Sequence, residues 1–293
     1  MNGIDGRNSR HTVGFLNKYD EFERYKENAS TYVIENVCGY DSLYQVMSNR
    51  QNYNHPQQSD LVKGEYEGGL KVWECSLDLI QVLISDRVLQ SDMKTLSILE
   101  LGCGHALPMI SHVQKHGNAS AECQVMFHDY NEEVLRDVTF PNVAINLGSE
   151  FVLNQSQFIH GSWRAVEKYI VENNCTFDLV LAAETVYDKS QLHAFSRCLL
   201  ESLYRSNLSM NGDGSVSKAY VAGKRFYFGV GGGMFEFCQV LQDVFRSQKV
   251  SEWTLRAMNS PDARKYEIHV ETLVSIEDGT SNIRDIIQVW ISQ

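Results

Sequence analysis

The segment ILELGCGHALP, residues 98–108, decides the fold, because an apolar strand pattern ends there in an acid, Glu100, and opens into a glycine turn. Gly102 and Gly104 have no side chain, so the backbone of this turn can approach a ligand closely. A helical pattern follows from about Leu107, and the first N–H groups of a helix have no partner within it. The segment predicts a strand, a ligand-binding turn and a helix; the alternative is a tight turn that binds nothing.

The same turn disfavours a nicotinamide cofactor. A dinucleotide-binding turn follows the pattern G-x-G-x-x-G. After Gly104 the sequence continues with His105, Ala106 and Leu107, so the third glycine is missing. A different nucleotide-like ligand is therefore expected.

Strand and helix patterns alternate on both sides of this turn. The run FDLVLAAE, residues 177–184, is continuously apolar, which is typical of a strand buried on both faces of a parallel sheet. The last two strand patterns are separated only by EDGTSN and predict a hairpin with an antiparallel strand. The expected strands are 97–101, 122–129, 157–160, 177–184, 217–223, 265–274 and 285–292, and the expected helices are 70–89, 107–116, from 132, 190–204 and 233–246. This alternation predicts an α/β fold with a doubly wound, mostly parallel sheet.

Two regions are expected along the chain. Residues 1–58 are rich in Asn, Gln, Tyr and Ser without sustained apolar periodicity, so they are predicted to be irregular, with short strands near Thr31–Val37. Residues 59–293 are expected to form one domain that contains the alternating strands and helices.

Composition excludes several classes of protein. The formal net charge of −11, without a run of like charges, disfavours direct nucleic-acid binding. No window approaches 18 apolar residues, so no membrane span is expected. The seven cysteines are never three positions apart, which predicts neither a disulfide framework nor a zinc ribbon. Because the first 16 residues lack the apolar stretch of a signal peptide, we expect the cytosol, the nucleus or both.

Polar and aromatic residues follow the other strand patterns. Asp129 ends the second strand, where a carboxylate can accept hydrogen bonds from both hydroxyls of a ribose; the alternative is a cap for the helix that follows. Trp163, after the third strand, either covers an adenine ring or belongs to the core. Glu184 and Tyr187, after the fourth strand, form an acid-x-x-aromatic pattern.

The string FGVGGG, residues 228–233, follows the fifth strand. Three adjacent glycines leave the backbone bare, which suits a substrate peptide; the alternative is a flexible connection. Lys224 precedes the glycines, whereas a phosphate loop needs its lysine after them. His112 and His116 have a metal-binding spacing, but Val113 stands where a zinc protease has Glu, so they are predicted to be exposed histidines and no metal is expected.

Seven motifs in order resemble a known family. They are YEGGLKVWECSLDL, ILELGCG, FHDYNEEVL, PNVAIN, GSW, ETVYD and KRFYFGVGGG. Together they are similar to the protein-histidine methyltransferases related to the METTL-type family 16, within the seven-strand, Rossmann-like class I methyltransferases. The match covers about residues 59–250.

The resemblance implies S-adenosylmethionine as cofactor and one histidine of a large-subunit ribosomal protein as acceptor, in cytoplasm and nucleus, with the enzyme a monomer. Family members often have a hydroxyl residue before the motif acid, where this chain has Ala183. A backbone contact survives that change. The implied cofactor residues are Val72, Trp73, Glu74, Cys75, Ser76, Glu100, Gly102, Gly104, Asp129, Tyr130, Asn131, Gly161, Ser162, Trp163 and Ala183.

The catalytic hypothesis concerns the acceptor. Glu184, helped by Tyr187, accepts the N–H of the imidazole nitrogen that is not methylated and so fixes the ring. Little base chemistry is needed, because free imidazole has a pKa of about 6.5 whereas that of lysine is about 10.4. The expected substrate-binding residues are Phe228, Gly229, Gly231 and Gly232.

Three alternatives stay open at this point. A lysine methyltransferase of the same family shares the acid-x-x-aromatic motif. A non-catalytic binding module for a ribosomal protein has no need of the cofactor turn. A small-molecule or RNA methyltransferase is disfavoured by the lack of a basic stripe and of an N-P-P-Y motif.

Overall fold

The computed structural model describes residues 12–28, 34–37, 42–46, 67–85, 97–116, 123–209, 216–248, 266–279 and 282–292. The chain divides into two compact units, Met1–Ser162 and Trp163–Gln293. Among the helices in the described ranges, none has the length and apolarity needed to cross a membrane.

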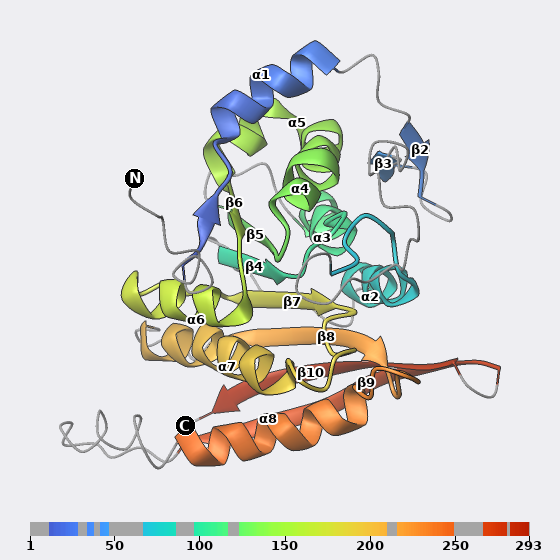
Figure 1. Ribbon diagram of the computed structural model, residues 1–293, viewed down its shortest axis with the longest axis vertical. Coiled ribbons are helices and arrows are strands. Elements are labelled where there is room, and N and C mark those ends of the chain that lie inside the picture. Colours follow the sequence, from blue (N-terminus) through green and yellow to red (C-terminus); the bar gives the residue numbers. More distant parts are fainter. Residues whose placement is uncertain are drawn as a thin grey trace, which may run out of the picture. The chain divides into compact units, whose positions relative to one another are not determined.

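A parallel sheet forms the centre of the first unit (Figure 1). Strands β4 (Ser97–Leu101), β5 (Gln124–Asp129) and β6 (Ser156–His160) lie in the order β6-β5-β4. Their register pairs Leu101 with His128 and Asp129 with His160, so the carboxyl ends of the three strands meet at one edge. In open α/β sheets this edge is where ligands bind. The short strand β1 (Gly14–Phe15) adds an antiparallel pair to β6.

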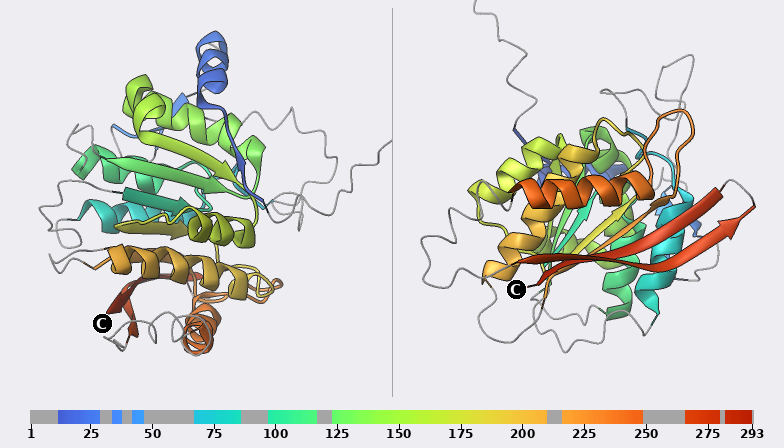
Figure 2. Two further views of the ribbon diagram at one scale, coloured as in Figure 1. Left: turned by 90° about the vertical axis from the view of Figure 1, so that its left-hand side faces the viewer. Right: turned by 90° about the horizontal axis from the view of Figure 1, so that it is seen from below.

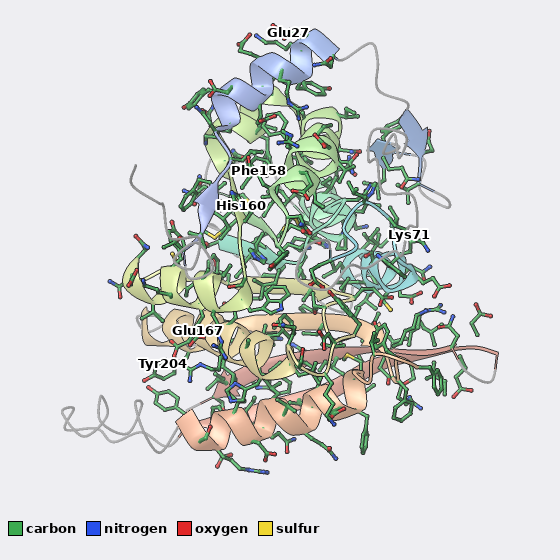
Figure 3. All side chains as sticks on the ribbon, viewed as in Figure 1. Glu27, Lys71, Phe158, His160, Glu167 and Tyr204 are labelled. Carbon is green, nitrogen blue, oxygen red and sulfur yellow. The ribbon has the colours of Figure 1, made fainter. Side chains whose placement is uncertain are left out.

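The helices of the first unit pack apolar side chains against this sheet. The rings of Phe127 and Phe158 stack with centroids 5.2 Å apart, and the Phe140 ring lies 5.3 Å from that of Phe158, which is labelled in Figure 3. The helical elements are α1 (Lys18–Asn28), α2 (Glu74–Ile84), α3 (Leu107–His116), α4 (Glu132–Val134), a π-helical turn (Leu135–Thr139) and α5 (Phe140–Gln155). Strands β2 (Ile34–Asn36) and β3 (Tyr44–Val46) form a separate antiparallel pair.

The second unit combines a parallel pair with an antiparallel hairpin. Strand β7 (Leu179–Ala183) is parallel to β8 (Lys218–Lys224), and β10 (Asn282–Ser292) pairs antiparallel with both β8 and β9 (Glu267–Asp278). Figure 2 shows β9 and β10 as two long neighbouring strands. The helices are α6 (Trp163–Glu172), α7 (Leu192–Ser209) and α8 (Met234–Gln248). Phe195 of α7 and Phe237 of α8 bring their rings to 5.4 Å and are fully buried.

The predicted α/β class, the alternation and the antiparallel C-terminal strand are confirmed. All seven expected strands are present, and β1 and β3 are additional strands. Helix α6 was missed because the sequence analysis placed a cofactor loop at its first residue, Trp163. Helix α2 begins at Glu74 and not at Leu70, because residues 67–73 form a loop before it.

The N-terminal segment has more structure than its composition suggests. Helix α1 has no buried residue, so it lacks the apolar periodicity that marks a helix in sequence. Half-buried side chains hold it: Arg24 donates to the carbonyl of Arg136 at 2.6 Å, Lys18 Nζ donates to that of Ser156 at 3.1 Å, and the Tyr25 ring meets that of Phe140 edge-on at 6.4 Å. Strand β2 lies within the short strand expected at residues 31–37. The predicted boundary at residue 58 falls outside the described residues and stays a prediction.

His112 was expected to be exposed, and this prediction is wrong. Its side chain faces the interior and is 1% exposed, and its ring lies 4.9 Å from that of His116. Neither ring nitrogen of His112 has a hydrogen-bond partner among the described residues. Burial lowers the pKa of His112 to about 3, and the neighbouring His116 lowers it further.

The substitution His112→Leu should stabilise the chain, most strongly in acid. The folded chain keeps His112 neutral at a pKa of about 3, whereas the unfolded chain protonates it near 6.5, so stability present above pH 6.5 is lost as the pH falls. At pH 8, removal of this ring, which has no hydrogen-bond partner among the described residues, should raise the free energy of unfolding by about 1 kcal/mol. At pH 5 a further ~2 kcal/mol is expected.

Urea unfolding at pH 5 and pH 8 measures both values. The exposed His193 on α7 supplies the control, because His193→Leu removes a ring that water already solvates. A variant at His112 that is less stable than the wild type at pH 5 contradicts the expectation.

Candidate functional site

The turn after β4 has the conformation that its glycines allow. Gly102 and Gly104 have φ values of 64° and 50°, and Ala106 has φ of 57° although it carries a Cβ. Two hydrogen bonds tie the turn to the end of β5: Cys103 N–H donates to the His128 carbonyl at 2.8 Å, and Gly104 N–H donates to Asp129 Oδ2 at 3.0 Å. The left-handed backbone therefore turns these N–H groups toward the neighbouring strand.

Asp129 is a buried carboxylate held by backbone N–H groups. Its Oδ1 accepts from Asn131 N at 3.2 Å, and its Oδ2 accepts from Gly104 N. Burial raises the pKa of Asp129 to about 6, against the opposing effect of backbone hydrogen bonds from Asn131, Gly104 and Tyr130. Because a carboxylate has about four acceptor sites, roughly one is left for a further donor. A contact to both ribose hydroxyls at once therefore requires a backbone bond to open.

Glu100 is a second buried carboxylate, on β4 beside the turn. Its side chain is 2% exposed, and Oε2 has no hydrogen-bond partner among the described residues. Burial raises the pKa of Glu100 well above its usual range, the Met109 N–H opposes this, and the charge of Asp129 raises it again. The negative charge of Asp129 disfavours ionisation of the neighbouring Glu100. A cationic ligand beside these two carboxyl groups would stabilise their ionised forms.

The loop of residues 67–73 packs against the same turn. A Cβ added to Gly69 would come within 2.6 Å of Val134 Cγ1. A Cβ added to Gly104, in the glycine turn, would come within 3.2 Å of Gly69 O. Trp73 Nε1 donates to Gly68 O at 3.0 Å, and Lys71 Nζ lies 4.5 Å from the centroid of the Trp73 ring. Gly69 of this loop thus contacts the glycine turn, and the predicted segment 72–76 follows Gly69 along the chain.

His128 joins the end of β5 to the turn after β6. Its Nδ1 accepts from Gly102 N at 3.4 Å and its Nε2 faces Gly161 O at 2.9 Å, which assigns the hydrogen to Nε2. Burial lowers the pKa of His128 to about 4, so the ring is neutral. Gly161 N also donates to Asp129 O at 3.1 Å. Hydrogen bonds to the His128 ring or to the backbone at the end of β5 thus join three of the predicted cofactor-binding residues, Gly102, Asp129 and Gly161.

Two side chains of α5 and the π-helical turn support the glycine turn from the other side. Thr139 Oγ1 donates to Gly104 O, and Asn142 Nδ2 donates to His105 O at 2.9 Å. Burial lowers the pKa of His105 to about 4, so it too is neutral. Asn142, in the PNVAIN motif, therefore helps to fix the backbone conformation of the glycine turn.

In the second unit, Glu184 follows β7 in a strained conformation. Its φ is 59°, which L-residues rarely adopt, and its N–H donates to Ala222 O at 2.9 Å. The Tyr227 hydroxyl donates a short hydrogen bond to Oε2 of Glu184. Oε1 of the same carboxylate is buried and has no partner among the described residues. One oxygen is thus fixed and the other is an acceptor without a donor.

The glycine string ties the segment after Glu184 in place. Gly232 N donates to Tyr187 O at 3.0 Å, Tyr227 N donates to Gly232 O at 2.9 Å, and Asp188 forms an isolated antiparallel bridge with Gly231. A Cβ on Gly232 would lie 2.3 Å from the carbonyl oxygens of both Val186 and Tyr187. The string is therefore a backbone clamp, and not simply a flexible connection.

Four exposed apolar side chains lie next to this clamp in sequence. Phe226, Phe228, Val230 and Phe235 are 53%, 80%, 46% and 58% exposed, and are called the aromatic surface below. The rings of Phe226 and Phe235 lie 6.2 Å apart. Exposed apolar side chains gathered in one segment are typical of an interaction surface.

The predicted site residues fall into both units. The first unit brings together Glu100, Gly102, Gly104, Asp129, Asn131 and Gly161, with the segment 72–76 beside them through residues 67–70. Trp163 begins α6, where it is half-buried and its ring packs edge-on against Phe195 at 5.1 Å, so both alternatives for it stay predictions. Ala183, Glu184 and Tyr187 lie in the second unit with the glycine string.

Sequence reasoning missed two important side chains. His128 and Tyr227 both stand inside quoted motifs, FHDYNEEVL and KRFYFGVGGG, but a histidine or tyrosine in a motif does not reveal which backbone atom or carboxylate it contacts. Tyr187 was expected to assist Glu184 directly, and in the structure the two are linked through Tyr227. Its ring meets that of Tyr227 edge-on at 6.4 Å, and Tyr227 donates the hydrogen bond to Glu184.

One hollow lies away from these residues. It measures about 500 Å³ and is lined by charged side chains of α6 and α7, among them Arg164, Lys168 and Arg197. Arg197 is paired at 2.6 Å with Glu167, which is labelled in Figure 3. No predicted site residue lines it. Within the described ranges, no group of three or more His, Cys, Asp or Glu side chains could hold a metal ion.

The α/β fold, the acid-x-Gly-x-Gly turn and the buried acid after the next strand are the features that the resemblance to class I methyltransferases led us to expect. A family profile described as "Lysine methyltransferase" matches residues 59–211, slightly more than half of the chain. The chain belongs to this family.

Curated relatives have a more specific name. A histidine protein methyltransferase 1 homolog of Dictyostelium discoideum is 34% identical over 79% of this chain and 60% of its own length. Histidine protein methyltransferase 1 of Schizosaccharomyces pombe is 34% identical over 63% of this chain and 59% of its own length. The chain thus spans about three fifths of the length of these relatives. Among solved structures, a ribosomal protein L11 methylase from Lactobacillus delbrueckii is 14% identical with a TM-score of 0.41, covering 82% of this chain and 91% of that one.

Substitution of Gly232 by Ala should disrupt the clamp, whereas Gly229→Ala should be mild. The added methyl group at Gly232 meets two carbonyl oxygens at 2.3 Å, so the string must move away from Tyr187. At Gly229, φ is 91° but an added Cβ would have nothing within 4 Å. Only the unfavourable backbone conformation should therefore lower the free energy of unfolding, by about 1–2 kcal/mol.

Thermal unfolding and methylation activity of the two variants measure the difference. We expect Gly232→Ala to lose at least 3 kcal/mol, or most of the activity if the string rearranges. Equal effects of the two substitutions would show that the clamp does not depend on the close approach at Gly232.

Proposed function

We propose that this chain transfers a methyl group from S-adenosylmethionine to an imidazole nitrogen of a histidine in a protein substrate. The observation that carries the proposal is the Glu184 carboxylate, with Oε2 held by Tyr227 and a buried Oε1 that has no partner in the part of the chain that the structure describes. Such an oxygen is an acceptor for the single N–H of a neutral imidazole. The names of the curated relatives support the histidine acceptor.

The first unit fits the cofactor. Gly102 and Gly104 leave room for the close approach of a ligand, Asp129 has a remaining acceptor site for a ribose hydroxyl, and the unpartnered Oε2 of Glu100 suits a cationic group. When bound, S-adenosylmethionine supplies an electrophilic methyl group on a sulfonium. The protein's part is to position the acceptor and exclude water.

Glu184 orients the acceptor and does not need to deprotonate it. A histidine with an ordinary pKa of about 6.5 is mostly neutral at pH 7, so one ring nitrogen already has a free lone pair. Glu184 Oε1 accepts the N–H of the other nitrogen, and the lone pair forms the new C–N bond while the electrons of the broken S–C bond stay on sulfur. The resulting imidazolium keeps its N–H on Glu184 until the proton leaves to solvent.

The aromatic surface is proposed as the docking site for the segment of the substrate that carries the histidine. Phe226 and Phe228 are the two chain neighbours of Tyr227, whose hydroxyl holds Glu184. Apolar side chains flanking the acceptor would bury Phe228, and the bare backbone at Gly229 and Gly231 allows a peptide to approach. A large-subunit ribosomal protein as the substrate, and a cytoplasmic and nuclear location, are further proposals that rest on the resemblance of the seven motifs.

A lysine acceptor is the second candidate, favoured by the description of the family profile. A lysine amine must lose its proton before it can attack, which costs about 4.6 kcal/mol at pH 7 for a pKa of about 10.4. Glu184 would then have to act as a base.

Methyl-labelled S-adenosylmethionine, incubated with the chain and a ribosomal protein fraction, should place label in methylhistidine. Glu184→Gln should lower turnover by about 10–100-fold, because an amide oxygen accepts the N–H more weakly than a carboxylate. Cofactor affinity should not change. Amino-acid analysis of the labelled protein identifies the acceptor.

Label in methyllysine would keep the family and overturn the histidine acceptor. Cofactor binding without any label would support a non-catalytic binding module. Full turnover of Glu184→Gln would remove the proposed role of Glu184.

Affinity for S-adenosylmethionine should weaken as the pH falls through about 6. A cationic ligand and a hydroxyl donor both favour ionised Asp129, whose pKa burial raises to about 6. Below that pH, binding must displace a proton, so Kd should rise by up to about tenfold per pH unit. Calorimetric titration between pH 5 and 7 measures it. Asp129→Asn should bind more weakly with a flatter pH dependence; a wild-type Kd independent of pH would contradict the expectation.

Phe228→Ala should weaken use of the protein substrate by about tenfold in kcat/KM, because docking then buries less apolar area. Cofactor affinity should stay constant. Phe15→Ala, which removes a 52% exposed ring on β1, is the matched control and should leave both quantities unchanged. Equal effects of the two substitutions would remove the aromatic surface from the proposal.

A further inference from the structure

The hydroxyl of Tyr227 has both of its hydrogen-bonding roles assigned. It accepts the Lys224 N–H at 3.0 Å, which occupies a lone pair, and it donates to Oε2 of Glu184. A phenol has a single hydrogen, so the bond from the backbone leaves that hydrogen for the carboxylate. The edge-on ring of Tyr187, with its centroid 6.4 Å away, limits the rotation of the Tyr227 ring.

This bond fixes the direction of the second carboxylate oxygen. The backbone of Glu184 is already set by its φ of 59° and by the bond from its N–H to Ala222 O. With Oε2 tied to Tyr227, rotation of the carboxylate would break a charge-assisted hydrogen bond. Oε1 therefore presents its acceptor in one direction, buried and without a partner among the described residues.

A fixed acceptor has a chemical consequence that a mobile one lacks. The two nitrogens of a histidine ring differ in their distance from the main chain, and a neutral ring has its hydrogen on one of them. An acceptor with one direction selects the tautomer and the ring orientation, so it selects the nitrogen whose lone pair is left for the methyl group.

We propose that Tyr227 is a positioning residue that, through Glu184, decides which ring nitrogen of the histidine is methylated. The inference rests on the proposed histidine acceptor. Loss of the hydroxyl frees the carboxylate to rotate, so the ring binds in both orientations and both nitrogens become methylated. The new C–N bond and the electrons left on sulfur are the same in either case; only the attacking nitrogen differs.

The variant Tyr227→Phe in the chain of 293 residues tests this. It keeps the ring that meets Tyr187 and removes the hydroxyl. Wild-type and variant chains are incubated with methyl-labelled S-adenosylmethionine and a ribosomal protein fraction, and the two methylhistidine isomers are separated after hydrolysis. We expect one isomer from the wild type. From the variant we expect incorporation about tenfold slower, a second isomer, and an unchanged affinity for the cofactor.

Two further variants separate positioning from general damage. Tyr19→Phe alters a 62% exposed tyrosine on α1 and should keep the wild-type rate and isomer. The double variant Tyr227→Phe/Glu184→Gln should be no slower than Glu184→Gln alone, because residues that act through each other are not additive. If Tyr227→Phe does not fold, Glu184→Asp, which draws the carboxylate away from the hydroxyl, should by itself yield both isomers.

The outcomes distinguish the inference from the proposed function. A single isomer from Tyr227→Phe, or effects of the two substitutions that multiply in the double variant, would overturn the role of Tyr227 and leave histidine methylation intact. A wild-type chain that forms no methylhistidine would overturn the acceptor itself, and the inference with it.

Discussion

The structure of the first unit depends on a buried carboxylate that is held by backbone N–H groups. Asp129 receives the N–H of Gly104 from one turn and that of Asn131 from the next, so a single side chain sets the conformation of both. Burial opposes its charge and raises its pKa to about 6, and these hydrogen bonds, together with the one from the Tyr130 N–H, keep the pKa from rising further. The glycines, the loop at residues 67–73 and the imidazole of His128 all fit around this arrangement.

A second carboxylate has the corresponding place in the other unit. Glu184 is held by a hydroxyl instead of by N–H groups, and its backbone is strained. Strain of this kind persists only where the surroundings impose it, and here the bond from the Glu184 N–H to Ala222 O and the bond from the Tyr227 hydroxyl hold the residue. The first unit thus holds buried acids and a glycine turn, and the second holds one oriented acid and an exposed aromatic surface.

The fold was largely predictable because its signals are local. Apolar runs of strand length, such as residues 179–183, and helical periodicity, such as residues 107–116, depend on neighbours along the chain. The misses have physical reasons. Helix α1 buries no side chain, so polar contacts with Arg136 and Ser156 place it, and no periodicity marks it. His112 looked like a surface residue because spacing alone does not tell which face of α3 packs inward.

The sequence by itself determined the main alternation of strands and helices, without α1 and α6, and the places of the glycine turn, Glu100, Asp129 and Glu184 in that alternation. Backbone preferences and hydrophobic patterns lie in adjacent residues, so they can be read from the sequence. Only the tertiary structure decided what each side chain contacts. His128 meets Gly161 across 33 positions and Tyr227 meets Glu184 across 43, and no local pattern encodes such pairs. The burial that raises the pKa of Asp129 and leaves Oε1 of Glu184 without a donor arises only when distant segments pack together.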